Sequence, residues 1–211
     1  MGYCLAKSNG SKKMNKTAKE IVWYATVAAL VFAARMLDHL FTGWFSINAA
    51  IVTLAVVYIC IFVRPTLLNA VLCGTVFGIM SLLTSLMFPG GFTQYFVNPL
   101  VSVLPRILVG VAVYFVYILI RKAGKKFEVP AMAAACVIGS AVNTFTVMTM
   151  IYFFMRLMQD VTYGSVIGLV IALNTLMEII IPPVITPFAV MGIRRGMHLD
   201  GKEGGQNGAE Q

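Results

Sequence analysis

Charged residues are scarce in this chain of 211 residues. Asp, Glu, Lys and Arg together make up 11% of the sequence, and hydrophobic residues make up 59%. Charged residues account for about 25% of a typical soluble protein. The mean hydropathy is accordingly high, at +0.86. This composition excludes a soluble globular protein and indicates a protein that lies in a membrane.

The motifs of common catalytic and metal sites are also missing. The sequence has no Walker A phosphate-binding loop, no HExxH zinc motif and no GxSxG nucleophile motif. The 4 cysteines are Cys4, Cys60, Cys73 and Cys136. Their spacing matches neither a disulfide framework nor a metal site, which favours buried thiols. We therefore predict that the chain is not an enzyme and holds no metal or cofactor.

Long apolar runs take up most of the sequence. They lie near residues 21–41, 47–63, 66–88, 99–120, 130–155 and 164–191. About 20 apolar residues are needed for a helix to cross the hydrocarbon layer of a membrane. Backbone groups inside the bilayer find no water, so they must form hydrogen bonds within the protein. Such runs are therefore expected to be helical. The sequence thus predicts an all-α, polytopic membrane protein with six transmembrane helices.

The positive charges predict how these helices are oriented. Thirteen of the 16 lysines and arginines lie before the first run, in every second turn or after the last run: Lys7, Lys12, Lys13, Lys16, Lys19, Arg64, Arg121, Lys122, Lys125, Lys126, Arg194, Arg195 and Lys202. Short loops rich in Lys and Arg stay in the cytoplasm. Both termini are therefore expected to be cytoplasmic. This topology accounts for the net charge of +8, and we expect no nucleic-acid partner.

Three regions follow from this pattern. Residues 1–20 form a basic cytoplasmic segment, residues 21–192 the six-helix membrane domain, and residues 193–211 a Gly-rich, polar tail that we expect to be disordered.

Residues 1–34 resemble a signal peptide. Cleavage there would leave an odd number of spans and reverse the charge pattern, so we expect the first helix to remain uncleaved.

Arg106 is the most informative polar residue inside an apolar run. It lies about 10 Å from the outer side of the fourth run at 1.5 Å per residue, on one helical face with Ser102 and Gly110. The glycine is expected to leave room beneath the guanidinium group. An arginine at this depth suits the binding of a carboxylate or phosphate. The alternatives are a structural ion pair with Glu178 or Asp160, or a side chain that reaches the membrane surface.

The fifth and sixth runs also carry polar residues near the middle of the membrane. Ser140, Asn143 and Thr144 form a patch in the fifth run, and Asn174 and Glu178 share one face of the sixth. These side chains suit hydrogen bonds between helices, and they also suit binding of the hydroxyl and amide groups of a small molecule. Their similar depth to Arg106 favours a shared pocket.

Two other features have simpler interpretations. Arg35 and Asp38 are one helical turn apart and are expected to pair with each other near the outer surface. Gly74 and Gly78 are spaced four residues apart, which allows close helix packing inside the protein. Small residues also recur every four positions along the first run, at Ala25, Ala29 and Ala33.

Two segments resemble a known family. They are residues 98–110, with the sequence NPLVSVLPRILVG, and residues 139–144, with the sequence GSAVNT. They are similar to the substrate-binding S components of energy-coupling factor (ECF) vitamin transporters, and the six-helix plan extends the resemblance over residues 20–192. The resemblance implies a protein of the bacterial cytoplasmic membrane that captures a vitamin from outside. It also implies docking on a transmembrane T subunit and two ATPase subunits.

The Pro-Arg and Asn-Thr patterns most resemble the pantothenate-type branch of this family. Carried over by motif, the resemblance implies that substrate contacts include Arg106 and Asn143, with Asn98, Asn174 and Thr144 as further candidates. The family's docking motif corresponds to three alanines of the first run, Ala25, Ala29 and Ala33. A folate- or riboflavin-binding S component, a proton-coupled carrier that uses Glu178 and a membrane scaffold remain as alternatives.

The charge pattern makes a prediction about topology. A reporter fused after Gln211 should give a cytoplasmic signal, and one inserted at Gly91 should give an external signal, because positively charged loops stay inside. Paired alkaline phosphatase and green fluorescent protein fusions measure both positions. A cytoplasmic signal at Gly91 would exclude the six-helix topology.

Overall fold

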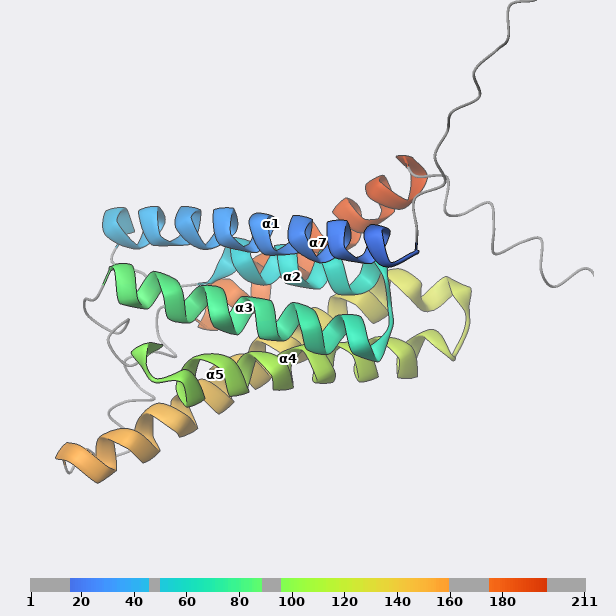
Figure 1. The fold of residues 1–211 in the computed structure, drawn as a ribbon. Helices are drawn as coiled ribbons and strands as arrows, with labels where there is room; N and C mark the ends of the chain where they lie inside the picture. Colours follow the sequence, from blue (N-terminus) through green and yellow to red (C-terminus); the bar gives the residue numbers. More distant parts are fainter. Residues whose placement is uncertain (1–15, 46–49, 89–95, 160–174, 197–211) are drawn as a thin grey trace, which may run out of the picture.

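The computed structural model describes residues 16–45, 50–88, 96–159 and 175–196, and within these residues every regular element is helical (Figure 1). The elements are α1 (Lys16–Phe45), α2 (Ile51–Val63), α3 (Leu67–Met87), α4 (Pro99–Arg121), the 3-10 helix η2 (Lys125–Phe127), α5 (Glu128–Gln159) and α7 (Leu176–Gly196). The described part of the chain contains no strand. The all-α prediction is therefore confirmed for these residues.

Five of the helices are long and apolar enough to cross a membrane: α1, α3, α4, α5 and α7. This is the pattern of a multi-pass membrane protein. Helix α2 differs, because its 13 residues extend only about 20 Å. A transmembrane span was expected over residues 47–63, and the helix found there, Ile51–Val63, is too short to confirm it. Residues 164–174 of the sixth expected run lie outside the described residues.

Helix α2 lies at the centre of the bundle. It packs against α1, α3, α4, α5 and α7. Its side chains Leu54, Tyr58, Ile61 and Phe62 are fully buried. A short helix surrounded in this way needs apolar residues on all sides, which is why its sequence is a nearly uninterrupted apolar run.

Glycines bring α3 and α4 into close contact. A Cβ atom added to Gly74 would collide with the backbone carbonyl of Arg106, and one added to Gly78 would lie 2.7 Å from the Cα atom of Val103. The expectation of internal packing for these two glycines is confirmed. The role expected for Gly110 is wrong, because its missing side chain makes room for the carbonyl of Ala70 on α3 and not for the Arg106 guanidinium.

The start of α1 and the end of α7 lie at the same end of the bundle (Figure 1). The turns that contain Arg64 and Arg121 lie there too, and we call this the basic end. Helix α7 continues to Gly196, so the expected start of a disordered tail at residue 193 is wrong by four residues. Residues 197–211 lie outside the described part of the chain.

The α3–α4 contact predicts unequal effects of alanine at two glycines. Gly110→Ala should lower the free energy of unfolding by about 1–3 kcal/mol, because the new Cβ meets backbone that cannot move aside. Gly192→Ala is the matched control, since its Cβ would meet nothing within 4 Å. Denaturant unfolding in detergent micelles measures both. Equal stability of the two variants would contradict the close packing seen at Gly110.

Candidate functional site

Helix α2 begins inside the bundle, well short of the end where α1 finishes and α4 begins (Figure 1). The first backbone N–H groups of a helix have no partner within it, and an apolar layer offers no water to replace one. The carboxylate of Asp38 on α1 accepts hydrogen bonds from Val52 N (2.9 Å), Thr53 N (2.9 Å) and Thr53 Oγ1 (2.5 Å). Ala50 N donates to Glu178 Oε1 on α7 (2.9 Å). Two carboxylates from distant parts of the chain therefore cap α2.

Glu178 also joins α7 to α5. Asn143 Nδ2 lies 3.5 Å from Glu178 Oε2, and the Ser140 hydroxyl donates to the backbone carbonyl of Glu178 at 2.8 Å. The Tyr58 hydroxyl of α2 lies 3.2 Å from Ser140 Oγ. All of these side chains are buried. Two residues of the polar patch expected on the fifth run, Ser140 and Asn143, thus form hydrogen bonds between helices with Glu178.

Two buried arginines lie close to these carboxylates. Arg35 and Arg106 are only 7% and 3% exposed. The charge of Arg35 interacts with those of Asp38 and Glu178, and the charge of Arg106 interacts with those of Arg35 and Glu178. We call Arg35, Asp38, Arg106 and Glu178 the charge cluster. Desolvation of an ion costs several kcal/mol unless other charges and hydrogen bonds compensate for it, which explains why the four groups occur together.

Arg106 is held in the cluster by its own helix and by two aromatic rings. Its Nη1 donates to the Val101 carbonyl at 2.8 Å. The guanidinium carbon lies 4.6 Å from the ring centre of Phe96 and 5.5 Å from that of Phe77. The ion pair with Glu178 that was one alternative for Arg106 is not formed between these two described residues. Asp160, the other alternative partner, lies outside the described residues.

Two buried polar atoms of the site have no hydrogen-bond partner among the described residues. They are Arg106 Nε, which is a donor, and Asn143 Oδ1, which is an acceptor. Buried polar atoms in proteins are nearly always paired, so each unpaired one needs an explanation. Here the two atoms belong to the residues for which the family resemblance implies substrate contacts, and each side chain interacts with Glu178.

The other predicted site residues have different positions. Asn98 caps α4, because its Oδ1 accepts a hydrogen bond from Leu100 N at 3.0 Å. Thr144 Oγ1 lies 3.5 Å from Thr175 Oγ1. Thr175 precedes Glu178 by about one helical turn. Asn174 lies outside the described residues. The structure thus brings Arg106 and Asn143 to the charge cluster and gives Asn98 a helix-capping contact.

Arg35 and Asp38, which were expected to pair with each other, are both buried, and their charges interact. The carboxylate of Asp38 has the additional role of capping α2. This role was missed because the cap and the helix come from separate elements, whereas capping patterns are readable in a sequence only when they are local. The shortness of the second apolar run was the available signal.

The three alanines at four-residue spacing lie on the surface of α1. Ala25, Ala29 and Ala33 are exposed, whereas Val27 and Val31 of the same helix are buried in the core. The stripe therefore does not serve packing among the residues that the structure describes.

The cysteines that the structure describes follow the sequence expectation. Cys60, Cys73 and Cys136 are free and buried, and all three lie in the central hydrophobic core. Cys4 lies outside the described residues.

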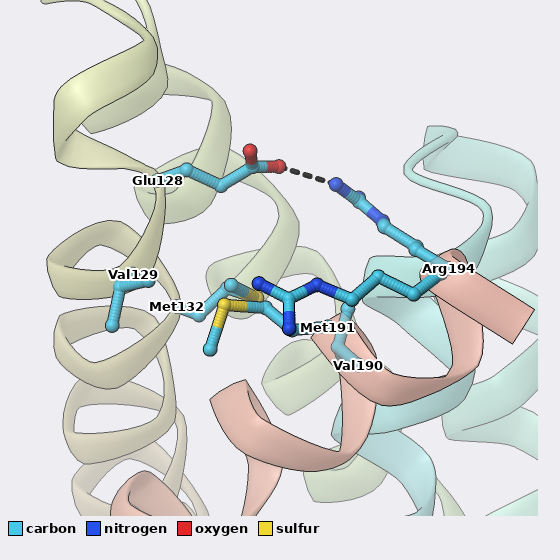
Figure 2. A pocket seen from close by; sticks show the side chains of 7 residues that line it. Glu128, Val129, Met132, Val190, Met191 and Arg194 are labelled. Atoms are coloured by element: carbon cyan, nitrogen blue, oxygen red, sulfur yellow. Dashed lines mark hydrogen bonds and ion pairs between the residues drawn. The ribbon is translucent and has the colours of Figure 1, made fainter. Parts of the chain in front are cut away.

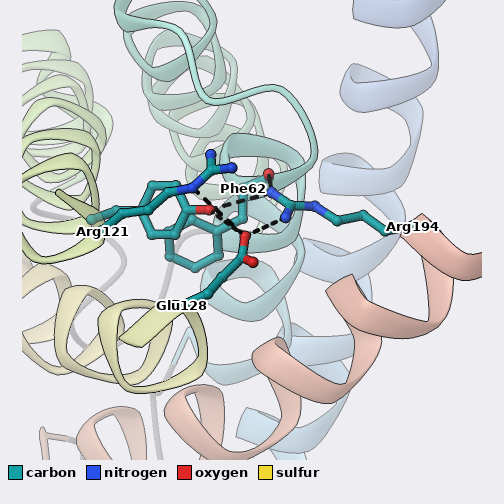
Figure 3. Close-up of polar contacts among 5 residues, drawn as sticks. Phe62, Arg121, Glu128 and Arg194 are labelled. Carbon is teal, nitrogen blue, oxygen red and sulfur yellow. Dashed lines mark hydrogen bonds and ion pairs between the residues drawn. The ribbon is translucent and has the colours of Figure 1, made fainter. Parts of the chain in front are cut away.

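A second polar region lies at the basic end, where Glu128 and Arg194 line a cavity of about 220 Å³ between α5 and α7 (Figure 2). Arg194 Nη1 donates to Glu128 Oε1, and its Nη2 donates to the carbonyl of Phe62 at 2.8 Å and lies 3.3 Å from the Tyr117 hydroxyl (Figure 3). Tyr117 in turn donates to Glu128 at 3.0 Å. We call these four residues the clasp, because they connect α2, α4, α5 and α7.

No protein-family model and no curated protein matches this chain. The resemblance in residues 98–110 and 139–144 therefore remains a hypothesis about function. The geometry of the charge cluster bears on it independently.

The capping of α2 makes a prediction about stability. Asp38→Ala should lower the free energy of unfolding by about 2–3 kcal/mol, because it leaves buried donors of Val52 and Thr53 without an acceptor. Asp38→Asn should cost less, since the amide oxygen still accepts. Glu20→Ala, on an exposed part of the same helix, is the control. Chemical unfolding in detergent measures all three, and an Asp38→Ala variant as stable as Glu20→Ala would contradict the capping role.

Proposed function

We propose that this chain is the solute-binding S component of an ECF-type importer in the bacterial cytoplasmic membrane, with a small anionic vitamin such as pantothenate as its ligand. The proposal rests on two buried polar atoms that have no partner among the described residues, the Nε donor of Arg106 and the Oδ1 acceptor of Asn143, whose side chains both interact with Glu178. A membrane protein keeps a buried arginine at a substantial energetic cost, so such a residue marks a functional site by default.

The arrangement of charges favours an anionic ligand. Asp38 and Glu178 use oxygen atoms to cap α2, and the start of that helix carries a partial positive charge of its own. Their negative charge is thus compensated by the helix as well as by the arginines. The Nε donor of Arg106 has no partner among the described residues, and a guanidinium group binds a carboxylate through two parallel hydrogen bonds.

The remaining polar groups favour a ligand with a hydroxyl or amide group. Asn143 spends its Nδ2 donor on Glu178, which leaves Oδ1 free to accept a hydrogen bond. A carboxylate held by Arg106 and an O–H or N–H group held by Asn143 would satisfy both unpaired atoms. This combination of groups is the chemistry of pantothenate and of related small vitamins.

Further observations support the architecture that the proposal requires. The start of α1 and the end of α7 both lie at the basic end (Figure 1), as expected if six spans leave both termini in the cytoplasm. The exposed alanine stripe on α1 is suited to close contact with a helix of a T subunit. The two ATPase subunits would supply the energy that a chain without a nucleotide motif cannot.

A proton-coupled carrier is the second candidate, because Glu178 is a buried carboxylate within the polar cluster. Folate or riboflavin would be alternative ligands of an S component. Co-purification separates the two classes of transporter: the S component requires an ATPase module for uptake, whereas the carrier requires a proton gradient alone.

The proposal predicts a specific effect of Arg106→Lys. Vitamin binding should weaken roughly 30-fold or more although the positive charge is kept, because an ammonium group cannot form the bidentate contact. Isothermal titration of the purified protein with pantothenate measures the affinity. Arg64→Lys, at the basic end, is the matched control and should bind as the wild type does.

A neutral ligand tests which group Arg106 contacts. Replacing the ligand carboxylate by an amide should cost the wild type much affinity and an Arg106→Ala variant far less, because the contact is already lost. Equal losses in both proteins would show that Arg106 does not bind the carboxylate. Uptake driven by a proton gradient without any ATPase would instead support the carrier.

A further inference from the structure

The cavity at the basic end has the size of a headgroup and not of a whole vitamin. It lies between the first turns of α5 and the last turns of α7 (Figure 2), with a volume of about 220 Å³. Pockets for complete small-molecule ligands usually measure about 300–1,000 Å³. A ligand of this cavity therefore places only a small polar group inside it.

The cavity carries one unmatched positive charge. Its charged lining residues are Glu128, Arg194 and Arg195. Arg194 forms an ion pair with Glu128, which also accepts a hydrogen bond from Tyr117 (Figure 3). Arg195 is exposed and forms no hydrogen bond or ion pair with any residue that the structure describes. The carboxylate is thus compensated within the protein, and Arg195 is left for an anion.

The rest of the lining is apolar and continues along the membrane-facing surface. Val129 of α5 and Met191 of α7 both line the cavity. Val137 lies two helical turns further along the same face of α5, and Phe188 and Val184 lie three and seven residues before Met191 on α7. These last three side chains are exposed. An apolar path therefore leads from the cavity towards the middle of the membrane.

We propose that this cavity binds the headgroup of an anionic phospholipid. Arg195 contacts the phosphate, the glycerol part lies beside Val129 and Met191, and the acyl chains follow the exposed apolar residues of α5 and α7. Basic pockets between transmembrane helices on the cytoplasmic side suit anionic headgroups, because the inner leaflet is rich in negatively charged lipid. The site lies at the end of α7 opposite Glu178 and is separate from the proposed vitamin site, about 24 Å away at 1.5 Å per residue.

Native mass spectrometry of the full-length protein tests this site. The protein in detergent is titrated with phosphatidylglycerol or with phosphatidylcholine. The wild type should retain one phosphatidylglycerol molecule in preference to phosphatidylcholine, and Arg195→Gln should weaken that binding roughly fivefold. Lys122→Gln removes the same charge from an exposed position at the basic end, outside the cavity, and should leave binding unchanged.

A second variant tests the cavity itself without changing its charge. Val129→Phe, at a residue that is 41% exposed, should fill the space and also reduce phosphatidylglycerol binding. Equal losses for Arg195→Gln and Lys122→Gln would overturn the proposal in favour of general surface attraction. Displacement of the lipid by an equal concentration of inorganic phosphate would overturn it in favour of a soluble anion, as would equal binding of the two lipids.

Discussion

The start of helix α2 inside the bundle is the constraint on which the interior of this protein depends. Buried backbone N–H groups need acceptors from the protein itself, and Asp38 and Glu178 supply them. Two carboxylates in an apolar interior need positive charge nearby. Arg35 and Arg106 provide it, and α1, α2, α4 and α7 are thereby bound to one another through charge as well as through packing.

Close helix packing places Arg106 in this arrangement. The backbone of α3 at Gly74 lies directly against the carbonyl of Arg106, so α4 has little freedom to shift along α3. The rings of Phe77 and Phe96 then hold the guanidinium group. An arginine that is held by backbone contact and by aromatic rings keeps its side chain in one orientation, which would lower the entropic cost of binding the proposed ligand.

Helices α5 and α7 connect the two polar regions of the molecule. Helix α7 carries Glu178 of the charge cluster and Arg194 of the clasp, and α5 carries Asn143 and Glu128, which contact them. Polar contacts therefore join the two helices at both ends of their shared interface, through Ser140 and Asn143 at one end and Glu128 at the other. Buried apolar residues such as Val190 and Met132 lie between these contacts.

The sequence by itself determined the features that depend on composition and local spacing. The scarcity of charge and the apolar runs predict helices in a membrane, and the glycine spacing on α3 predicts a close helix contact. The positions of the Lys and Arg residues predict that the positively charged turns lie at one end of the bundle. Helical spacing also placed polar residues of the fifth and sixth runs at compatible depths, because helical rise converts sequence distance into depth.

Only the tertiary structure decided which partner each polar residue has. The contact between Ala50 and Glu178 joins residues 128 positions apart, and no local pattern encodes such a distance. The spacing of Arg35 and Asp38 predicts that their charges interact, but only the packed structure shows that the Asp38 carboxylate also accepts hydrogen bonds from the N–H groups of α2. Gly110 serves the α3 backbone for a similar reason, since the closest neighbour of a glycine depends on which helix packs against it. The apolar runs predict where helices form. Which buried donor forms a hydrogen bond with which acceptor depends on how the helices pack.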